Sequence, residues 1–170
     1  NEQIYNNALE KNRIIYVGAL AGVLPAGPGS SHQAVRDIAA LNAIPNLLMI
    51  EPCSALELEL ALEYAISGTD KSVYLRLVSI PWDIPYSLPS GYRMELGKGG
   101  VLLDGQDAVL IAYGPIMLSE AFAAAKALKQ KHQMSIKVLN FPWLNHIDSE
   151  WLSQEVSSCR WLFTIDNHYL

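Results

Sequence analysis

Short apolar runs alternate with helical segments along this chain. Six runs have the length of strands and few polar interruptions: Ile14 to Gly18, Leu47 to Ile50, Ser72 to Leu77, Ala108 to Tyr113, Ser135 to Asn140 and Trp161 to Ile165. Continuous apolar runs are typical of parallel strands that are covered on both faces. Helices are expected between them, at about Gln3 to Lys11, Ser31 to Ala43, Ala55 to Ile66, Met117 to His132 and Ser149 to Val156. The alternation predicts an α/β fold with mainly parallel sheets flanked by helices.

The segment that starts at Ala55 is ambiguous by pattern alone. Leu56 to Leu60 alternates apolar and acidic residues with the period of a strand. Leu, Glu and Ala are strong helix formers, however, and no β-branched residue occurs before Ile66. Ser54 and Glu57 also have the spacing of a capping box, so we expect a helix that begins after Ser54.

A stretch rich in proline divides the chain. Residues 81–93 have no regular apolar period and contain Pro81, Pro85, Pro89 and Gly91, which is typical of a linker. We therefore expect two small domains, at 1–80 and 94–170, each with a mainly parallel sheet. The first opens on a helix with no strand before it, and the second stops just after its last strand, so we expect both to be partial.

Composition and charge exclude several classes of partner. The 170 residues are 51% hydrophobic and carry a net charge of −5 without any basic run, which argues against nucleic acid and anionic membranes. No apolar run reaches the roughly 18 residues of a membrane span. The first residues do not resemble a signal peptide, so we expect a cytoplasmic protein. Cys53 and Cys159 lie among apolar residues and are expected to be reduced thiols.

Several common catalytic signatures are missing from the sequence. The four histidines have no metal-ligand spacing and no clustered carboxylates or thiols, so we predict no metal site in this chain. A G-x-S-x-G elbow, a Walker loop and an intact G-x-G-x-x-G are also absent. Hydrolase, nucleoside triphosphatase and dinucleotide-binding functions therefore lack support.

The loop Gly27-Pro28-Gly29-Ser30-Ser31-His32-Gln33 predicts a ligand site. Its glycines let the backbone turn tightly, and Ser30 or Ser31 can cap the helix expected to start there. The free N–H groups of a helix start favour anions, and they disfavour a charged imidazole at His32, which we expect to be neutral. A helix cap beside a surface histidine is an equally good interpretation of these residues alone.

Arg76 ends an otherwise apolar strand. In open α/β sheets ligands bind outside the carboxyl ends of strands, and a guanidinium binds phosphate or carboxylate through two parallel hydrogen bonds. The alternative is an ion pair with an acid such as Glu51 or Asp83. We expect Arg76 and His32 to lie at the same edge of the sheet.

Two long stretches resemble the transketolase-type thiamine diphosphate enzymes. GPGSSHQAVRDIAALNAIPNLLMIEPCSALELELALEYA, followed by the strand ending in Arg76, resembles the later part of the pyrimidine-binding domain. Residues 94–168, with GKGGVLLDGQDAVLIAYG, VLNFPWLNHID and WLFTIDNH, resemble the C-terminal domain. The resemblance implies that His32, with Ser31 of the same motif, contacts substrate and that Arg76 binds the phosphate of a sugar phosphate.

The chain also departs from the family pattern. The loop is one residue longer, and it lacks the acid that contacts a substrate hydroxyl. Glu2 cannot be equated with the glutamate that activates the cofactor, and the G-D-G…N signature for magnesium and diphosphate is missing. We therefore assign no catalytic residue to this chain and leave its cofactor-binding residues open.

The resemblance implies a C-terminal portion or small subunit of an enzyme that transfers two-carbon ketol units between sugar phosphates. Thiamine diphosphate and magnesium would belong to the assembled enzyme, in which a companion segment or subunit binds them. We expect a homo- or hetero-oligomer, and no turnover by this chain alone. The alternatives are a 2-oxo acid dehydrogenase β-type or deoxyxylulose phosphate synthase-type fragment, a non-catalytic scaffold and a phosphate-binding module. Asp166, Asn167 and His168 follow the last predicted strand and are given no role.

Overall fold

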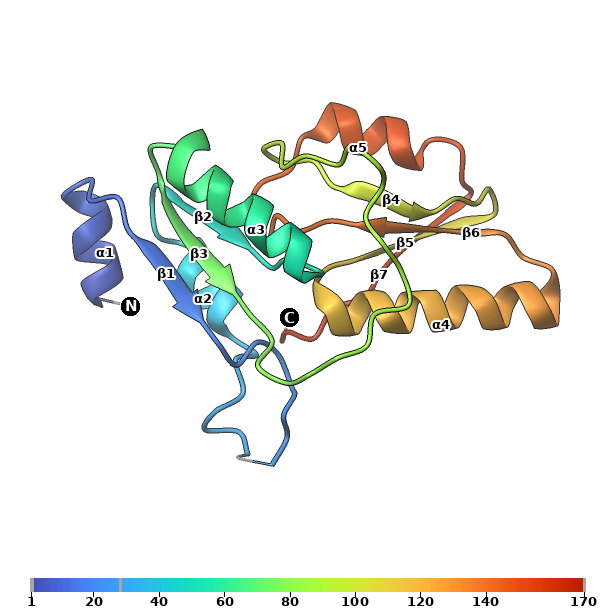
Figure 1. Cartoon of the computed structure of the whole chain (residues 1–170), viewed down its shortest axis with the longest axis horizontal. Coiled ribbons are helices and arrows are strands. Elements are labelled where there is room, and N and C mark those ends of the chain that lie inside the picture. Colours follow the sequence, from blue (N-terminus) through green and yellow to red (C-terminus); the bar gives the residue numbers. More distant parts are fainter. Residues whose placement is uncertain (1, 28, 170) are drawn as a thin grey trace.

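The computed structural model describes residues 2–27 and 29–169, which form two sheets side by side (Figure 1). The first sheet has the order β1-β3-β2, with β1 at Ile15–Gly18, β2 at Leu47–Ile50 and β3 at Ser72–Arg76. Both strand pairs are parallel, which confirms the predicted strands of the first half. β3 is central and is buried along its whole length, as its apolar sequence predicts.

Helices cover both faces of the first sheet. α2 (Asp37–Asn42) and α1 (Glu2–Leu9) pack on one face, and α3 (Ala55–Glu63) with the π turn Tyr64–Gly68 packs on the other. The side chains of β2 alternate between the two layers. Leu48 and Ile50 join the cluster under α3, whereas Leu47 and Met49 join the cluster under α1 and α2.

The second sheet has the order β4-β6-β5-β7. Its strands are β4 (Gly100–Leu103), β5 (Ala108–Ala112), β6 (Ile136–Asn140) and β7 (Trp161–Thr164). β5 pairs parallel to β6 and β7, and β4 pairs antiparallel to β6. α4 (Gly114–His132) and α5 (Ser149–Val156) cover opposite faces (Figure 1). The sequence interpretation missed β4, because this short strand starts within the pair Gly99-Gly100, ends before Asp104-Gly105 and depends on β6 for its pairing.

The helix predicted from Ser31 to Ala43 is wrong in its first half. α2 begins only at Asp37, and Arg36 is its N-cap residue without a side-chain cap. Ala34 instead donates its N–H to the Leu20 carbonyl and accepts from the Gly22 N–H. These long-range backbone bonds satisfy the segment before Asp37 in a non-helical path, so neither Ser30 nor Ser31 caps a helix.

The chain between the two sheets contains neither helix nor strand. Residues 77–99 run from β3 across to β4, and they include the predicted linker (Figure 1). A second connection follows β6, where Pro142 and Leu144 hydrogen-bond to Glu51 and Met49 at 2.9 Å along the free edge of β2. The two sheets are therefore joined by backbone contacts as well as by the linker.

Candidate functional site

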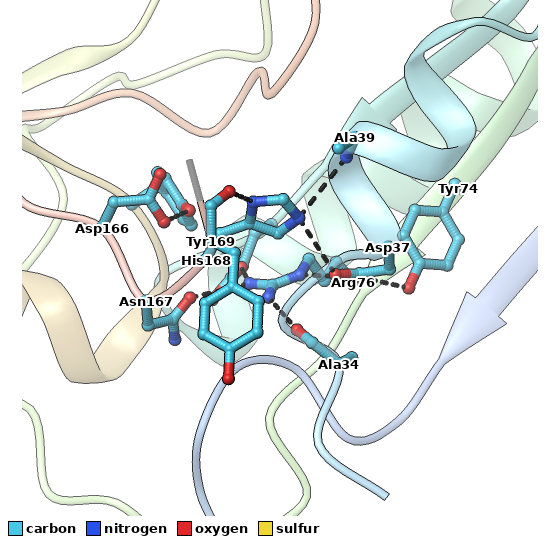
Figure 2. A network of polar contacts seen from close by, with 11 residues as sticks. Ala34, Asp37, Ala39, Tyr74, Arg76, Asp166, Asn167, His168 and Tyr169 are labelled. Carbon is cyan, nitrogen blue, oxygen red and sulfur yellow. Dashed lines mark hydrogen bonds and ion pairs between the residues drawn. The ribbon is translucent and has the colours of Figure 1, made fainter. Parts of the chain in front are cut away.

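Arg76 lies at the carboxyl end of β3 and is fully buried. Nε donates to Asp37 Oδ2 at 2.8 Å, and Nη2 donates to the Ala34 carbonyl at 2.6 Å. Nη1 donates to Glu51 Oε2 and to Asn167 Oδ1, the latter at 3.1 Å. Figure 2 shows the guanidinium at the centre of this network. All three of its nitrogens are therefore bound to groups of the protein.

The two acids that face Arg76 differ in their surroundings. Glu51 follows β2 and is 1% exposed, and burial raises its pKa to about 7 although the guanidinium opposes this shift. Asp37 accepts a further hydrogen bond from the Tyr74 hydroxyl at 2.8 Å. Burial disfavours the charged form of Arg76, but Glu51 and Asp37 together raise its pKa above the ordinary value. The guanidinium thus stays charged, while Glu51 changes its protonation near neutral pH.

The segment after β7 completes the network. Asp166 accepts a hydrogen bond from Tyr113, and Asn167 binds Arg76. His168 is held between the two sheets: Nδ1 donates to the Tyr169 carbonyl at 2.6 Å and Nε2 accepts from the Ala39 N–H at 3.4 Å. Its Nε2 also lies 4.0 Å from Asp37 Oδ1 (Figure 2). The last described residues of the chain therefore contact the start of α2.

His32 and Ser31 are exposed in the loop that follows β1. The Ser31 hydroxyl lies 2.9 Å from His32 Nδ1, and the His32 N–H donates to the Gly29 carbonyl at 3.1 Å. Ala34, two residues further on, binds Arg76. The loop with His32 and the end of β3 therefore meet at the same edge of the sheet. Pro28 of the predicted loop motif lies outside the described residues.

This arrangement changes the interpretation of His32. Because α2 begins at Asp37, His32 does not lie in the first turn of a helix, and the predicted effect of a helix start on its charge does not apply. Its position depends on loop contacts instead. Of the two acids that the sequence offered for Arg76, Glu51 forms an ion pair with it, as Asp37 also does, whereas Asp83 is exposed in the linker.

Sequence reasoning did not assign several members of the network. Asp37 carries no distinctive motif, whereas Glu51 is considered only as an alternative ion-pair partner of Arg76. The polar run Asp166 to His168 did carry a signal, because it follows a parallel strand at its carboxyl end, where ligand sites of α/β sheets form. From the sequence alone the run is given no role.

The described part of the chain contains no group of three or more histidines, cysteines or acids that could hold a metal ion. None of its helices has the length and apolar character that a membrane crossing requires. Cys53 is buried and free, and burial raises the pKa of its thiol, so it is poorly suited to act as a nucleophile.

Comparisons with known proteins agree with one another. The family model "Transketolase, pyrimidine binding domain" matches residues 1–79, and "Transketolase, C-terminal domain" matches residues 97–170. A putative uncharacterized transketolase family protein of Sinorhizobium fredii is 38% identical over 154 residues, which are 89% of this chain and 43% of the relative. The 1-deoxy-D-xylulose-5-phosphate synthase of Thermosynechococcus vestitus is 31% identical over 151 residues, covering 86% of this chain and 23% of the relative.

Solved structures lead to the same family. A split gene transketolase, described as an inactive β4 tetramer, is similar with a TM-score of 0.81 and 26% identity. The similarity covers 98% of this chain and 52% of that chain. The chain thus spans about half or less of these relatives.

Proposed function

Because the chain belongs to the transketolase family, whose pyrimidine-binding and C-terminal domain models match residues 1–79 and 97–170, we propose that it supplies substrate-contacting residues to a thiamine diphosphate enzyme. The enzyme transfers two-carbon ketol units between sugar phosphates. This chain forms its C-terminal portion, as a segment or small subunit. The observation that carries the proposal is the exposed His32, held beside Ser31 at the carboxyl edge of a parallel sheet.

His32 and Ser31 act as a pair in this proposal. The Ser31 hydroxyl at Nδ1 orients the imidazole, and no described residue hydrogen-bonds Nε2. That nitrogen can donate to or accept from a sugar hydroxyl, according to the tautomer. An oriented contact of this kind holds the substrate for reaction at the cofactor. The resemblance also predicts that Arg76 binds the substrate's phosphate, for which at least one of its present acceptors would have to be displaced.

Thiamine diphosphate supplies the electron sink for carbon–carbon bond cleavage when it is bound. The residues of this chain do not fit its diphosphate and magnesium: the G-D-G…N signature is missing, and no metal-ligating group occurs among the described residues. We assign those contacts to a companion segment, on the same polypeptide or on a partner subunit, and expect no turnover by residues 1–170 alone.

Two exposed strands support an assembly with such a companion. β1 is an edge strand of the first sheet, and Val17 on it is 59% exposed. β7 is an edge strand of the second sheet, with Leu162 and Phe163 about half exposed. Edge strands with exposed apolar side chains are usually covered in the functional protein. We propose a homo- or hetero-oligomer on this basis.

A deoxyxylulose phosphate synthase-type reaction is the second candidate. It is favoured by the 31% identity to the 1-deoxy-D-xylulose-5-phosphate synthase of Thermosynechococcus vestitus. The two candidates differ in their donor, a ketose phosphate for ketol transfer and a 2-oxo acid for the synthase type. The assembled enzyme should be assayed with each donor in turn. Activity with the ketose phosphate favours ketol transfer, and activity with the 2-oxo acid favours the synthase type.

The test is ketol transfer by the assembled enzyme, formed by this chain and the companion that bears G-D-G…N. His32→Ala should lower kcat/KM by about tenfold to a hundredfold, the effect of losing a substrate hydrogen bond. His132→Ala is the matched control, since this histidine is exposed at the end of α4. Unchanged kcat and KM in His32→Ala would refute its role. Binding of sugar phosphates by the isolated chain, with no activity in any assembly, would favour a phosphate-binding module.

A further inference from the structure

The contacts of Arg76 come from four separate parts of the chain. Asp37 starts α2, Glu51 follows β2, Ala34 belongs to the His32 loop, and Asn167 follows β7. We propose that Arg76 is a positioning residue that holds the His32 loop against the segment after β7, and that it does not bind the substrate's phosphate. The proposal rests on the proposed function for His32 and gives Arg76 a role other than the one that the family resemblance implies.

Hydrogen-bond geometry leaves no place for a phosphate on this guanidinium. Arginine has five N–H donors, and bidentate recognition of phosphate uses two parallel N–H groups on one edge of the fork. In Arg76, Nε is bound to Asp37, and both donors of Nη1 are used by Glu51 and Asn167. Nη2 has one donor bound to Ala34 and one left over. No edge therefore keeps two free N–H groups, and the side chain is 0% exposed.

The charges around Arg76 also argue against a bound phosphate. Asp37 and Glu51 both lie within ion-pair distance of the guanidinium, so its single positive charge faces a carboxylate even when Glu51 is protonated. Asp166 adds a further carboxyl close enough to contribute to the raised pKa of Glu51. Arg36 precedes Asp37 in the sequence but is exposed. A phosphate entering this network would face more negative than positive charge.

The same contacts fix the loop that carries His32. The Ala34 carbonyl accepts from both Arg76 and the Gly22 N–H, so Arg76 closes the loop where it returns to the segment that follows β1. The Asn167 side chain packs directly against Gly22. This glycine has a φ of +73°, and a Cβ at its position would collide with the Asn167 side chain. The Tyr169 N–H donates to the Val35 carbonyl at 2.8 Å. His32 thus lies on a loop whose two ends depend on Arg76 and on the segment after β7.

Kinetics of the assembled enzyme separate positioning from phosphate binding. Arg76→Lys and Asn167→Ala should lower kcat by roughly tenfold for a phosphorylated sugar and equally for its unphosphorylated counterpart, because a displaced His32 affects both. Arg13→Lys is the matched control, an arginine that binds the Ala65 and Ile66 carbonyls away from the network. A rise in KM that Arg76→Lys causes only for the phosphorylated sugar would overturn the proposal.

Hydrogen exchange on the full chain provides a measurement independent of activity. In Asn167→Ala, which keeps Arg76 and its ion pairs, amide exchange of residues 20–36 should become about tenfold faster, a loss of roughly one hydrogen bond. Arg13→Lys should leave that loop unchanged. Unchanged exchange in the loop of Asn167→Ala and Arg76→Lys would contradict the positioning role. Slower exchange of the wild type on addition of inorganic phosphate, lost in Arg76→Lys, would show that Arg76 binds phosphate.

The two experiments fail independently. If no companion restores ketol transfer, the proposed function fails, while the exchange result still decides the role of Arg76.

Discussion

Glu51 shows how a single side chain is controlled by both halves of the chain. Its carboxyl binds Arg76 on one side and approaches the first residue of α4 on the other. Gly114 has a φ of +67°, and a Cβ there would collide with Glu51 Oε1, so only glycine permits this approach. The resulting burial raises the pKa of Glu51 to about 7. Burial thus favours the protonated form of Glu51 more than it does for an exposed glutamate.

Stability should fall with rising pH because of Glu51. The pKa of Glu51 is about 7 in the folded chain, against 4.5 for a glutamate outside the fold. The folded state therefore binds the proton more tightly than the unfolded state, and this contribution to stability is lost as the pH rises from about 4.5 to 7. The loss is on the order of 3 kcal/mol. Glu51→Gln removes the titration but keeps the side-chain shape. Urea denaturation at a series of pH values should show a smaller decline for the variant, and identical pH profiles would contradict the shift.

The start of α3 shows how one helix terminus serves as a junction. Ser54 accepts from the Glu57 N–H at 3.2 Å, as the predicted capping box requires, but Glu57 Oε2 accepts from Cys53 rather than from Ser54. The other carboxylate oxygen accepts from the Tyr92 hydroxyl at 2.6 Å and from Asn140 Nδ2 at 2.7 Å. A local cap thus joins the helix to the linker and to β6.

Glu57→Gln should destabilise the chain more than Ser54→Ala does. Loss of the cap hydroxyl costs about 1 kcal/mol. The amide nitrogen of glutamine would face buried N–H or O–H donors, and leaving these unsatisfied costs about 1–3 kcal/mol more. Glu59→Gln on the exposed side of α3 is the control and should be nearly neutral. Equal free energies of unfolding for Glu57→Gln and Glu59→Gln would show that the junction does not stabilise the fold.

At the scale of the whole molecule, the segment that follows β6 joins the two halves of the chain, because it lies along the edge of β2. Asn145 accepts from the Met49 N–H at 2.9 Å and donates to the Leu47 carbonyl at 2.7 Å. Trp143 is buried in the core of the first sheet, with its ring edge-on to Tyr64 at a centroid distance of 5.1 Å. The first sheet therefore includes side chains and backbone groups from the second half of the sequence. This shared core predicts that the two halves unfold together.

Asn145→Ala tests this coupling. The change leaves a backbone N–H and a carbonyl of β2 without partners and should lower the free energy of unfolding by about 1–3 kcal/mol. Tryptophan fluorescence and circular dichroism should still report one transition, shifted to lower denaturant. Asn42→Ala, at an exposed position at the end of α2, is the control. Two separate transitions in the wild type would contradict a shared core.

Sequence alone determined the elements whose signals are local. The apolar runs predicted the parallel strands, because a strand covered on both faces needs apolar residues at every position. The helix formers after Ser54 predicted α3 against a strand-like alternation. Arg76 and the His32 loop were expected at one edge, because the carboxyl ends of parallel strands lie together, and they do meet there through Ala34.

The tertiary structure decided what those residues bind. Residues 31–36 are not helical, and at their centre both backbone groups of Ala34 bind distant partners, namely Leu20, Gly22 and Arg76, rather than groups of a helical turn. The acceptors of Arg76 lie 25, 39, 42 and 91 positions away along the chain. No local pattern encodes such distances. A buried guanidinium requires several acceptors at once, and only the folded chain brings them to the same point.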